Sequence, residues 1–198
     1  MEFALVAPVF LFTVFAMIDG GFLLFSVNAV DQATTIGSNS VASLGRVSTA
    51  DITSMQRMAA SAGLETTSLV KVSEIDVEEL VTNATKDGFS TNADGTPTVQ
   101  SDCVVLGVPG QPCVNQYKFG SPGPTPTIVV INGTCLASVD PSQCPPWPPS
   151  ARDVTNGESS FVGLKVTYTY RFLTGIAPNI TLTTTKTFRL EPENSPGT

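Results

Sequence analysis

The sequence predicts an α+β fold in which a long N-terminal apolar α-helix carries a C-terminal antiparallel β-sheet head with disulfide-stapled loops. Residues 3–18 are uncharged and almost wholly apolar, two segments near the C-terminus alternate apolar and polar side chains, and four cysteines lie in the Pro-rich middle of the chain. We expect residues 1–46 to form the apolar helix, residues 47–66 a second helix and connector, and residues 67–198 the β-rich head.

The N-terminal segment is long enough to cross a lipid bilayer. Asp19 is the single charged residue between residues 3 and 30, and about 20 apolar residues span the hydrocarbon core. A signal peptide is the alternative interpretation, but signal peptides begin with a basic region, and the first Lys or Arg here is Arg46. A helix over residues 1–46 would be about 68 Å long at 1.5 Å per residue, which no small domain can bury.

Two positions in this segment weaken a helix locally. Pro8 lacks the N–H that a helix interior needs and clashes with the preceding turn, so we expect a kink or a loosened turn there. Gly20 and Gly21 form the second weak point because glycine is a poor helix former, although small residues also let helices pack closely.

Glu2 and Asp19 place carboxyl groups in or beside the apolar run. A charged side chain costs a few kcal/mol in the bilayer interior, so such residues generally have a partner or a function. For Asp19 the alternative is a simple water-exposed position at the membrane boundary. For Glu2, which has no basic residue near it in sequence, a partner must come from elsewhere.

The helix is expected to become amphipathic as it leaves the membrane, and to restart after a break near Arg46. Ser48-Thr49-Ala50-Asp51 resembles a helix N-terminus, which predicts a second helix over about 49–62, with Gly63 as its C-cap. Apolar or small side chains recur at helical spacing at Val30, Thr34, Val41, Leu44, Ile52, Met55, Ala59 and Ala62.

The remainder is predicted to form strands. In residues 68–81 the alternation changes phase between Val70/Val72 and Ile75/Val77, which indicates a β-bulge. Residues 163–173 place Val166, Tyr168, Tyr170 and Phe172 on one face, and after the turn 174–179 a second strand places Ile180, Leu182, Phe188 and Leu190 inward, which predicts an antiparallel hairpin. A short strand near 115–119 and another near 126–135 complete the sheet.

The cysteines predict two disulfides. Sequential pairing of Cys103 with Cys113 and of Cys135 with Cys144 is the favoured connectivity among the three that four cysteines allow. A zinc cluster would need four unusually spaced thiolates, since the chain has no histidine. Disulfides imply an oxidising compartment outside the cytoplasm. Beyond Cys144, a polyproline-like loop is predicted to present Trp147.

Composition leaves little chemistry for catalysis. Without histidine there is no usual base for a nucleophile, and the acidic run Glu74, Asp76, Glu78, Glu79 is expected to fall on alternate faces of a strand as solvated surface. We therefore expect no enzyme activity, no cofactor and no metal site. The formal net charge of −7 argues against nucleic acid as a partner. Glycosylation is possible at the sequons of Asn83, Asn132 and Asn179.

The opening "MEFALVAPVFLFTVFAMIDGGFLLF" resembles TadE-like proteins, minor pilins of the tight-adherence branch of type IV pili. The family carries an acid-aromatic-Ala-Leu motif, a proline and a long apolar helix. The segment "VTYTYRFLTGIAPNITLTTTKTFRLEP" is similar to the C-terminal hairpin of that family. On this resemblance the assembly residues are Glu2, Phe3, Pro8, Asp19, Gly20 and Gly21.

The resemblance implies a precursor that a prepilin peptidase cleaves, that the cytoplasmic (inner) membrane holds, and that pilus assembly machinery polymerises into an extracellular filament. Its partners would be copies of itself or other pilins, and Glu2 would neutralise a terminal amine of a neighbouring subunit. Whether it is the bulk or a minor tip subunit stays open, as does a part in surface adhesion. The alternative is a permanently membrane-anchored surface protein that binds a ligand through Trp147.

Overall fold

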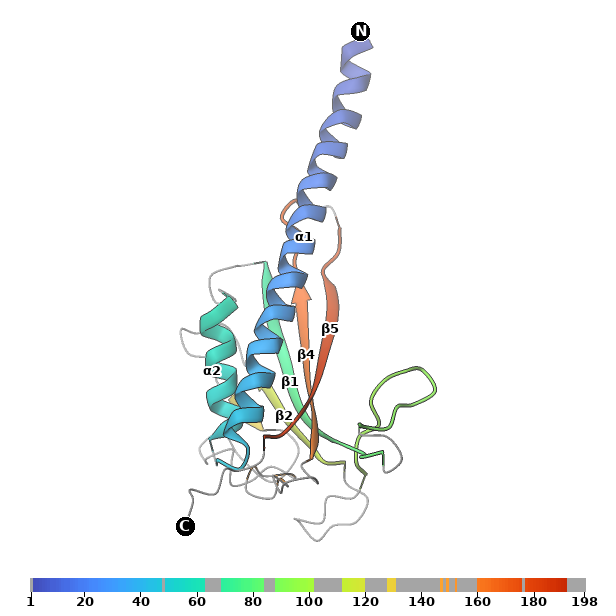
Figure 1. Ribbon diagram of the computed structural model, residues 1–198. Helices are drawn as coiled ribbons and strands as arrows, with labels where there is room; N and C mark the ends of the chain where they lie inside the picture. Colours follow the sequence, from blue (N-terminus) through green and yellow to red (C-terminus); the bar gives the residue numbers. More distant parts are fainter. Residues whose placement is uncertain are drawn as a thin grey trace, which may run out of the picture.

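The computed structural model confirms the α+β class (Figure 1). Two helices, α1 (Glu2–Leu44) and α2 (Ala50–Ala62), accompany five strands, β1 (Val70–Leu80), β2 (Val114–Phe119), β3 (Ile128–Val130), β4 (Phe161–Tyr170) and β5 (Ile180–Arg189). The structure describes residues 2–47, 49–62, 69–83, 88–101, 112–119, 128–130, 147, 149, 152, 160–175 and 177–191, without the side chains of 2–5, 61–62, 119 and 128–130.

α1 has two environments along its length. Its 43 residues correspond to about 64 Å. The C-terminal part lies along the sheet, whereas the N-terminal part extends beyond the rest of the molecule (Figure 1). The helix ends at Leu44, close to the predicted break, because Gly45 adopts a left-handed φ of 47°. A residue without a Cβ takes that conformation at little cost.

The strands form one antiparallel sheet in the order β3-β2-β1-β4-β5. The predicted C-terminal hairpin is confirmed, since β4 and β5 pair in continuous register from Phe161↔Arg189 to Tyr170↔Ile180. The register of β1 against β4 shifts between Val72 and Glu74. This irregularity is the bulge that the change of phase predicts.

The core lies between the helices and one face of the sheet. The inward positions predicted for β4, which are Val166, Tyr168 and Tyr170, are buried. In α2, Met55 is buried as predicted, and Met58 is a buried residue that the pattern missed. A contiguous cluster joins the layers and includes Val30, Ala33, Val41, Met55, Met58, Ile75, Val77, Tyr117, Trp147, Val162, Leu164, Val166 and Tyr170.

The prediction of a solvated acidic run on β1 was wrong. Glu74, Asp76 and Glu78 are two residues apart and so share one face, and both Asp76 and Glu78 are buried there. Lys165 Nζ lies 3.1 Å from Asp76 Oδ2 and 3.8 Å from Glu78 Oε1. Burial raises the pKa of both carboxyl groups, and the charge of Lys165 opposes that shift. The run is thus a partly neutralised structural cluster.

A buried ion pair ties α2 to the head. Arg152 Nη2 lies 2.7 Å from both carboxylate oxygens of Asp51. Tyr117 Oη and Asn115 Nδ2 donate to Asp51 Oδ2 at 2.8 and 3.1 Å. Burial, followed by the charge of Asp51, raises the pKa of Tyr117 well above its ordinary value, so the phenol stays protonated and can donate.

Trp147 is part of this network, and the prediction of a presented, ligand-gripping Trp147 was wrong. Its side chain is 2% exposed. Its backbone N–H donates to Asn115 Oδ1, its carbonyl accepts from Asn115 Nδ2, and the Arg152 guanidinium lies 4.7 Å from its ring centroid. The indole is buried because the backbone on which it sits is held by Asn115 and its ring is covered by a buried cation.

The disulfide pairing stays a prediction. Cys113 is buried and is not a free thiol. Cys103, Cys135 and Cys144 lie outside the described residues. Of the three sequons, Asn179 is exposed, Asn83 is half-buried, and Asn132 lies outside the described residues.

Gly37 of α1 lies close to Met58 of α2 and Leu164 of β4, and we expect Gly37→Ala to destabilise the folded chain. A Cβ there would lie 2.5 Å from Met58 Cγ, with Met58 Sδ closer still, and 3.0 Å from Leu164 Cδ2. Overpacking of this kind costs about 1–3 kcal/mol, and the gain in helix propensity of about 1 kcal/mol offsets part of it, so we expect a net loss of up to about 2 kcal/mol. Urea unfolding of the detergent-held chain measures the loss.

Gly21→Ala is the matched control for this substitution. An added Cβ at Gly21 meets no atom within 4 Å. This variant therefore keeps only the gain in helix propensity, and we expect it to be as stable as the wild type or slightly more stable. Equal unfolding midpoints for Gly37→Ala and Gly21→Ala would show that the Met58 side chain moves aside without a loss of folding stability.

Candidate functional site: the apolar helix and its junction with the head

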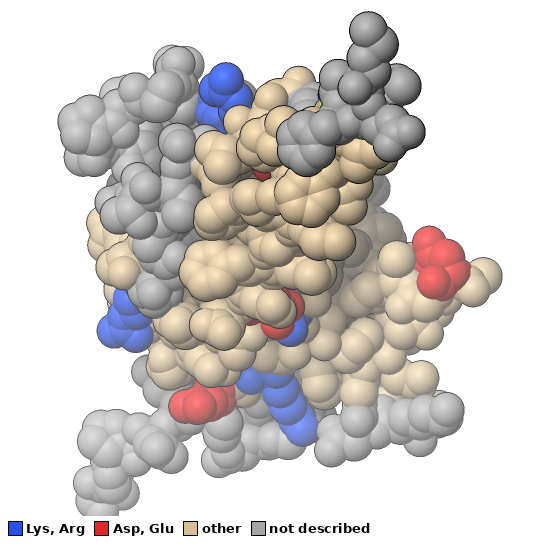
Figure 2. Space-filling view, turned by 90° about the horizontal axis from the view of Figure 1, so that it is seen from above, with Lys and Arg blue, Asp and Glu red and all other residues tan. Residues whose placement is uncertain are grey.

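The surface of α1 is the main apolar surface of the described structure. Seen from above in Figure 2, uncharged atoms fill most of the middle of the view, and few Lys, Arg, Asp or Glu side chains interrupt them. Large hydrophobic side chains are exposed along more than six turns of the helix, at Val6, Val9, Phe10, Leu11, Phe12, Phe15, Met17, Ile18, Phe22, Leu24, Phe25 and Val27.

Burial of α1 begins at Asp19. From there one face is buried at three- and four-residue spacing, through Ser26, Val30, Ala33 and Gly37. Before Asp19 no described side chain of the helix is buried. From Val6 onward the helix is long and apolar enough to cross a membrane. Only 11% of its most apolar 18-residue stretch is buried by the rest of the chain.

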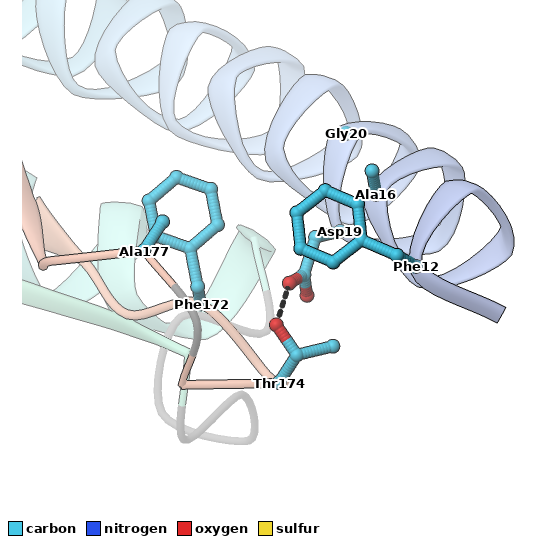
Figure 3. Close-up of a pocket in the computed structure, with 7 residues that line it drawn as sticks. All are labelled: Phe12, Ala16, Asp19, Gly20, Phe172, Thr174 and Ala177. Carbon is cyan, nitrogen blue, oxygen red and sulfur yellow. Dashed lines mark hydrogen bonds between the residues drawn. The ribbon is translucent and has the colours of Figure 1, made fainter. Parts of the chain in front are cut away.

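Asp19 joins α1 to the turn between β4 and β5. The backbone N–H of Leu173 donates to Asp19 Oδ1 at 3.1 Å, and Thr174 Oγ1 donates to Asp19 Oδ2 (Figure 3). Tyr170 Oη donates to the backbone carbonyl of Asp19 at 3.4 Å. Burial, and then the charge of Asp19, raise the pKa of this Tyr170 phenol. Asp19 is 6% exposed, so the structure does not support the water-exposed alternative.

A small apolar pocket lies beside this junction. Its volume is about 230 Å³, and its walls come from α1 and from the turn. Figure 3 shows the rings of Phe12 and Phe172 on either side, with the Asp19 carboxylate pointing to Thr174 between them. Gly20 forms part of the α1 wall, and because it has no side chain, it does not fill the pocket.

A second polar contact holds α1 to β5 further along. Lys186 Nζ lies 2.7 Å from Asp31 Oδ1 and 2.9 Å from Oδ2. The side chains of Asp31 and Lys186 are 45% and 35% exposed. Water therefore screens this pair, and it contributes less than the enclosed Asp19 contact.

The structure describes the side chains of some predicted assembly residues but not of others. Glu2 and Phe3 are in the first turn of α1, and their side chains lie outside the described residues. Pro8, Gly20 and Gly21 are inside a continuous helix, and an added Cβ at either glycine meets no atom within 4 Å. The local weakening expected at these positions stays a prediction. Within the described part of the chain, no atom packs against the position of a Cβ at either glycine, which leaves room for a neighbour.

The comparison with known families bears on this helix. Residues 1–38 match the family model of TadE-like proteins. The resemblance read from the opening motif is thereby confirmed over this segment, which covers most of α1. The TadE-like match ends before the head, so the likeness of the C-terminal hairpin stays a prediction. The curated proteins and the solved structures gave no match to the chain.

The junction partners of Asp19 were missed by sequence reasoning. Leu173 and Thr174 are more than 150 positions away from Asp19. Leu173 ends the predicted strand 163–173, and Thr174 begins the predicted turn 174–179. A signal existed, because a carboxylate inside an apolar run needs hydrogen-bond donors. The sequence shows that need but does not identify the donors.

Proposed function

We propose that this chain is a pilin-like structural subunit of a tight-adherence pilus. It is held in the membrane by α1 and is then polymerised through the same helix into an extracellular filament. The TadE-like match over residues 1–38 supports the pilin-like class. The observation that carries the proposal is the exposed apolar surface of α1 ahead of Asp19, which the head leaves uncovered.

Membrane residence and filament packing can use one surface. Lipid tails are as apolar as Leu or Phe, so an apolar helix exchanges lipid for other helices at little hydrophobic cost. A protruding helix makes head-to-tail contacts that do not close on themselves, and such contacts generate open helical filaments. The open space around Gly20 and Gly21 would allow close approach of a neighbouring helix.

The proposal includes the expected processing and partners. A prepilin peptidase would cleave the precursor at the cytoplasmic membrane, and assembly machinery would pass the subunit to copies of itself or to other pilins. Its role is structural rather than catalytic. Surface adhesion by the filament is a possible consequence of the same arrangement.

Shearing and fractionation of cells test the proposal directly. We expect the chain both in the membrane fraction and in sheared surface filaments, identified by mass spectrometry and negative-stain microscopy. A permanently anchored surface protein would stay in the membrane fraction alone. Purified filaments without this polypeptide would overturn the assignment.

We expect Glu2→Ala to abolish or strongly reduce filaments while the precursor stays inserted in the membrane. Removing one carboxylate does not lessen the apolarity of α1, but it removes the charge proposed to pair with a neighbouring terminal amine. The yield of sheared filament measures assembly, and resistance to alkaline extraction measures insertion. Glu2→Asp is the matched control, because it keeps the charge and should retain more filament than Glu2→Ala. Wild-type yields from Glu2→Ala would remove the role of Glu2.

A further inference from the structure

We propose that the β4–β5 turn at the base of the head dips into the lipid bilayer surface beside α1, with Leu173 among the acyl chains. This inference rests on the membrane residence proposed above. It adds a second membrane contact that is made by the head rather than by the helix.

Leu173 has an exceptional position in the head. Its side chain is 59% exposed. No other large hydrophobic side chain of the described sheet and its turns is exposed. All the other exposed large hydrophobic side chains that the structure describes are in α1, except Val47, which lies three residues after the end of that helix. A single exposed leucine is ordinary, but its neighbours here are the exposed apolar residues of a candidate membrane span.

The depth of Leu173 follows from those neighbours. Leu173 and Thr174 line a shallow groove with Phe15 and Ile18 of α1. Both helix residues precede Asp19, so Leu173 lies at the level of side chains that are in the bilayer when α1 spans it. The hydrogen bonds from Leu173 and Thr174 to Asp19 keep the turn at this level.

The length of the apolar surface agrees with this depth. Apart from Ile36, the exposed large hydrophobic side chains of α1 run from Val6 to Val27, which corresponds to about 33 Å, close to the hydrocarbon thickness of about 30 Å. Asp19 lies eight residues before Val27, or about 12 Å inside that end of the surface. The turn can contact α1 at this level only by entering the membrane boundary. Its two hydrogen-bond donors lower the free-energy cost of placing the Asp19 carboxylate there.

Two cations lie at the end of the strands that leads into the turn. Both are exposed: Arg171 directly follows β4, and Lys71 lies on the neighbouring strand β1, where it pairs in register with Thr169. Neither makes an ion pair with a carboxylate of the described residues. Long basic side chains at this height can reach lipid phosphates while their stems cover apolar surface. The arrangement fits the headgroup layer of a bilayer that contains anionic lipid.

Tryptophan quenching in vesicles tests the inference on the full chain. The variant Leu173→Trp is reconstituted in phosphatidylcholine brominated in its acyl chains, mixed with phosphatidylglycerol. Phe10→Trp serves as the control within the membrane span, and Thr183→Trp as the control on the exposed part of β5. The buried Trp147 contributes the same background to all three variants. We expect bromolipid to reduce the added emission of Leu173→Trp about as much as that of Phe10→Trp, and to leave Thr183→Trp unchanged.

The other outcomes overturn the inference in distinguishable ways. Quenching of Phe10→Trp without quenching of Leu173→Trp rejects the dipping turn and leaves the membrane residence of α1 intact. No quenching of Phe10→Trp rejects both. Equal quenching of all three variants shows a head lying flat on the lipid. A blue shift of Leu173→Trp that disappears on dilution into excess lipid identifies a second subunit as the occupant and also rejects it.

Discussion

Arg152→Met should destabilise the folded chain by about 3–5 kcal/mol, the cost of leaving a buried charge without its partner. The side chains of Arg152 and Asp51 are 0% and 2% exposed, so water cannot replace the lost cation. Asp51 would keep its hydrogen bonds from Tyr117 and Asn115 but lose the neutralising charge. The packing of the guanidinium over Trp147 would be lost as well.

Urea unfolding of the detergent-held chain, followed by tryptophan fluorescence, measures this loss. Trp147 is the one tryptophan of the sequence and lies inside the network, so it reports the unfolding of this region directly. A large fall in the midpoint at unchanged slope indicates lost stability rather than a changed unfolded state.

The double variant Asp51→Asn/Arg152→Met decides whether charge is the cause. Asparagine keeps an acceptor oxygen for the donors of Tyr117 and Asn115 while it removes the negative charge. Replacing both members of a buried ion pair is often close to neutral, so we expect the double variant to recover much of the stability. If Arg152→Met costs as much in the Asp51→Asn background as in the wild type, lost packing over Trp147 explains the effect instead.

Features of local periodicity could be predicted from the sequence. Alternation from Val166 to Tyr170 predicts a half-buried strand because successive side chains point to opposite faces. The change of phase after Val72 predicts the bulge for the same reason. The apolar run of α1 predicts a helix that no small head can cover, and the structure confirms its exposure.

Contacts between distant segments could not be predicted. Arg152 and Asp51 are 101 positions apart, and nothing in either local sequence indicates the other. Trp147 looked exposed because its neighbours are prolines, but the Asn115 amide holds its backbone inward. The sequence predicted solvated acids on β1 because charged side chains are usually exposed to water. The pairing of β1 with β4 instead places Lys165 beside Asp76. In each case the decisive partner comes from another strand or helix.

Asp19→Ala should release the β4–β5 turn from α1 while the rest of the sheet stays folded. The substitution removes the charged acceptor of the Leu173 N–H and the Thr174 hydroxyl. A hydrogen bond to a charged group contributes about 1.5–3 kcal/mol, so the local loss is roughly 3 kcal/mol. Every 1.4 kcal/mol corresponds to a factor of ten, so the turn should open about 100 times more often.

Hydrogen exchange of the Leu173 amide reports this opening, because that amide is the donor to Asp19. We expect its exchange to accelerate about 100-fold, while amides of the β1–β4 pairing keep their protection. Trypsin cleavage after Arg171, which is exposed beside the turn, should accelerate in parallel.

Asp31→Ala is the matched control on the same helix. Asp31 also binds the head, through Lys186, but this pair is 45% and 35% exposed and water can replace either partner. Exposed ion pairs contribute about 0–1 kcal/mol, so exchange near Lys186 should change little. Equal acceleration of hydrogen exchange by Asp19→Ala and Asp31→Ala would mean that enclosure by the turn does not strengthen the Asp19 hydrogen bonds. A larger effect of Asp19→Ala, confined to the turn, would show that the carboxylate inside the apolar surface sets where the head meets the membrane span.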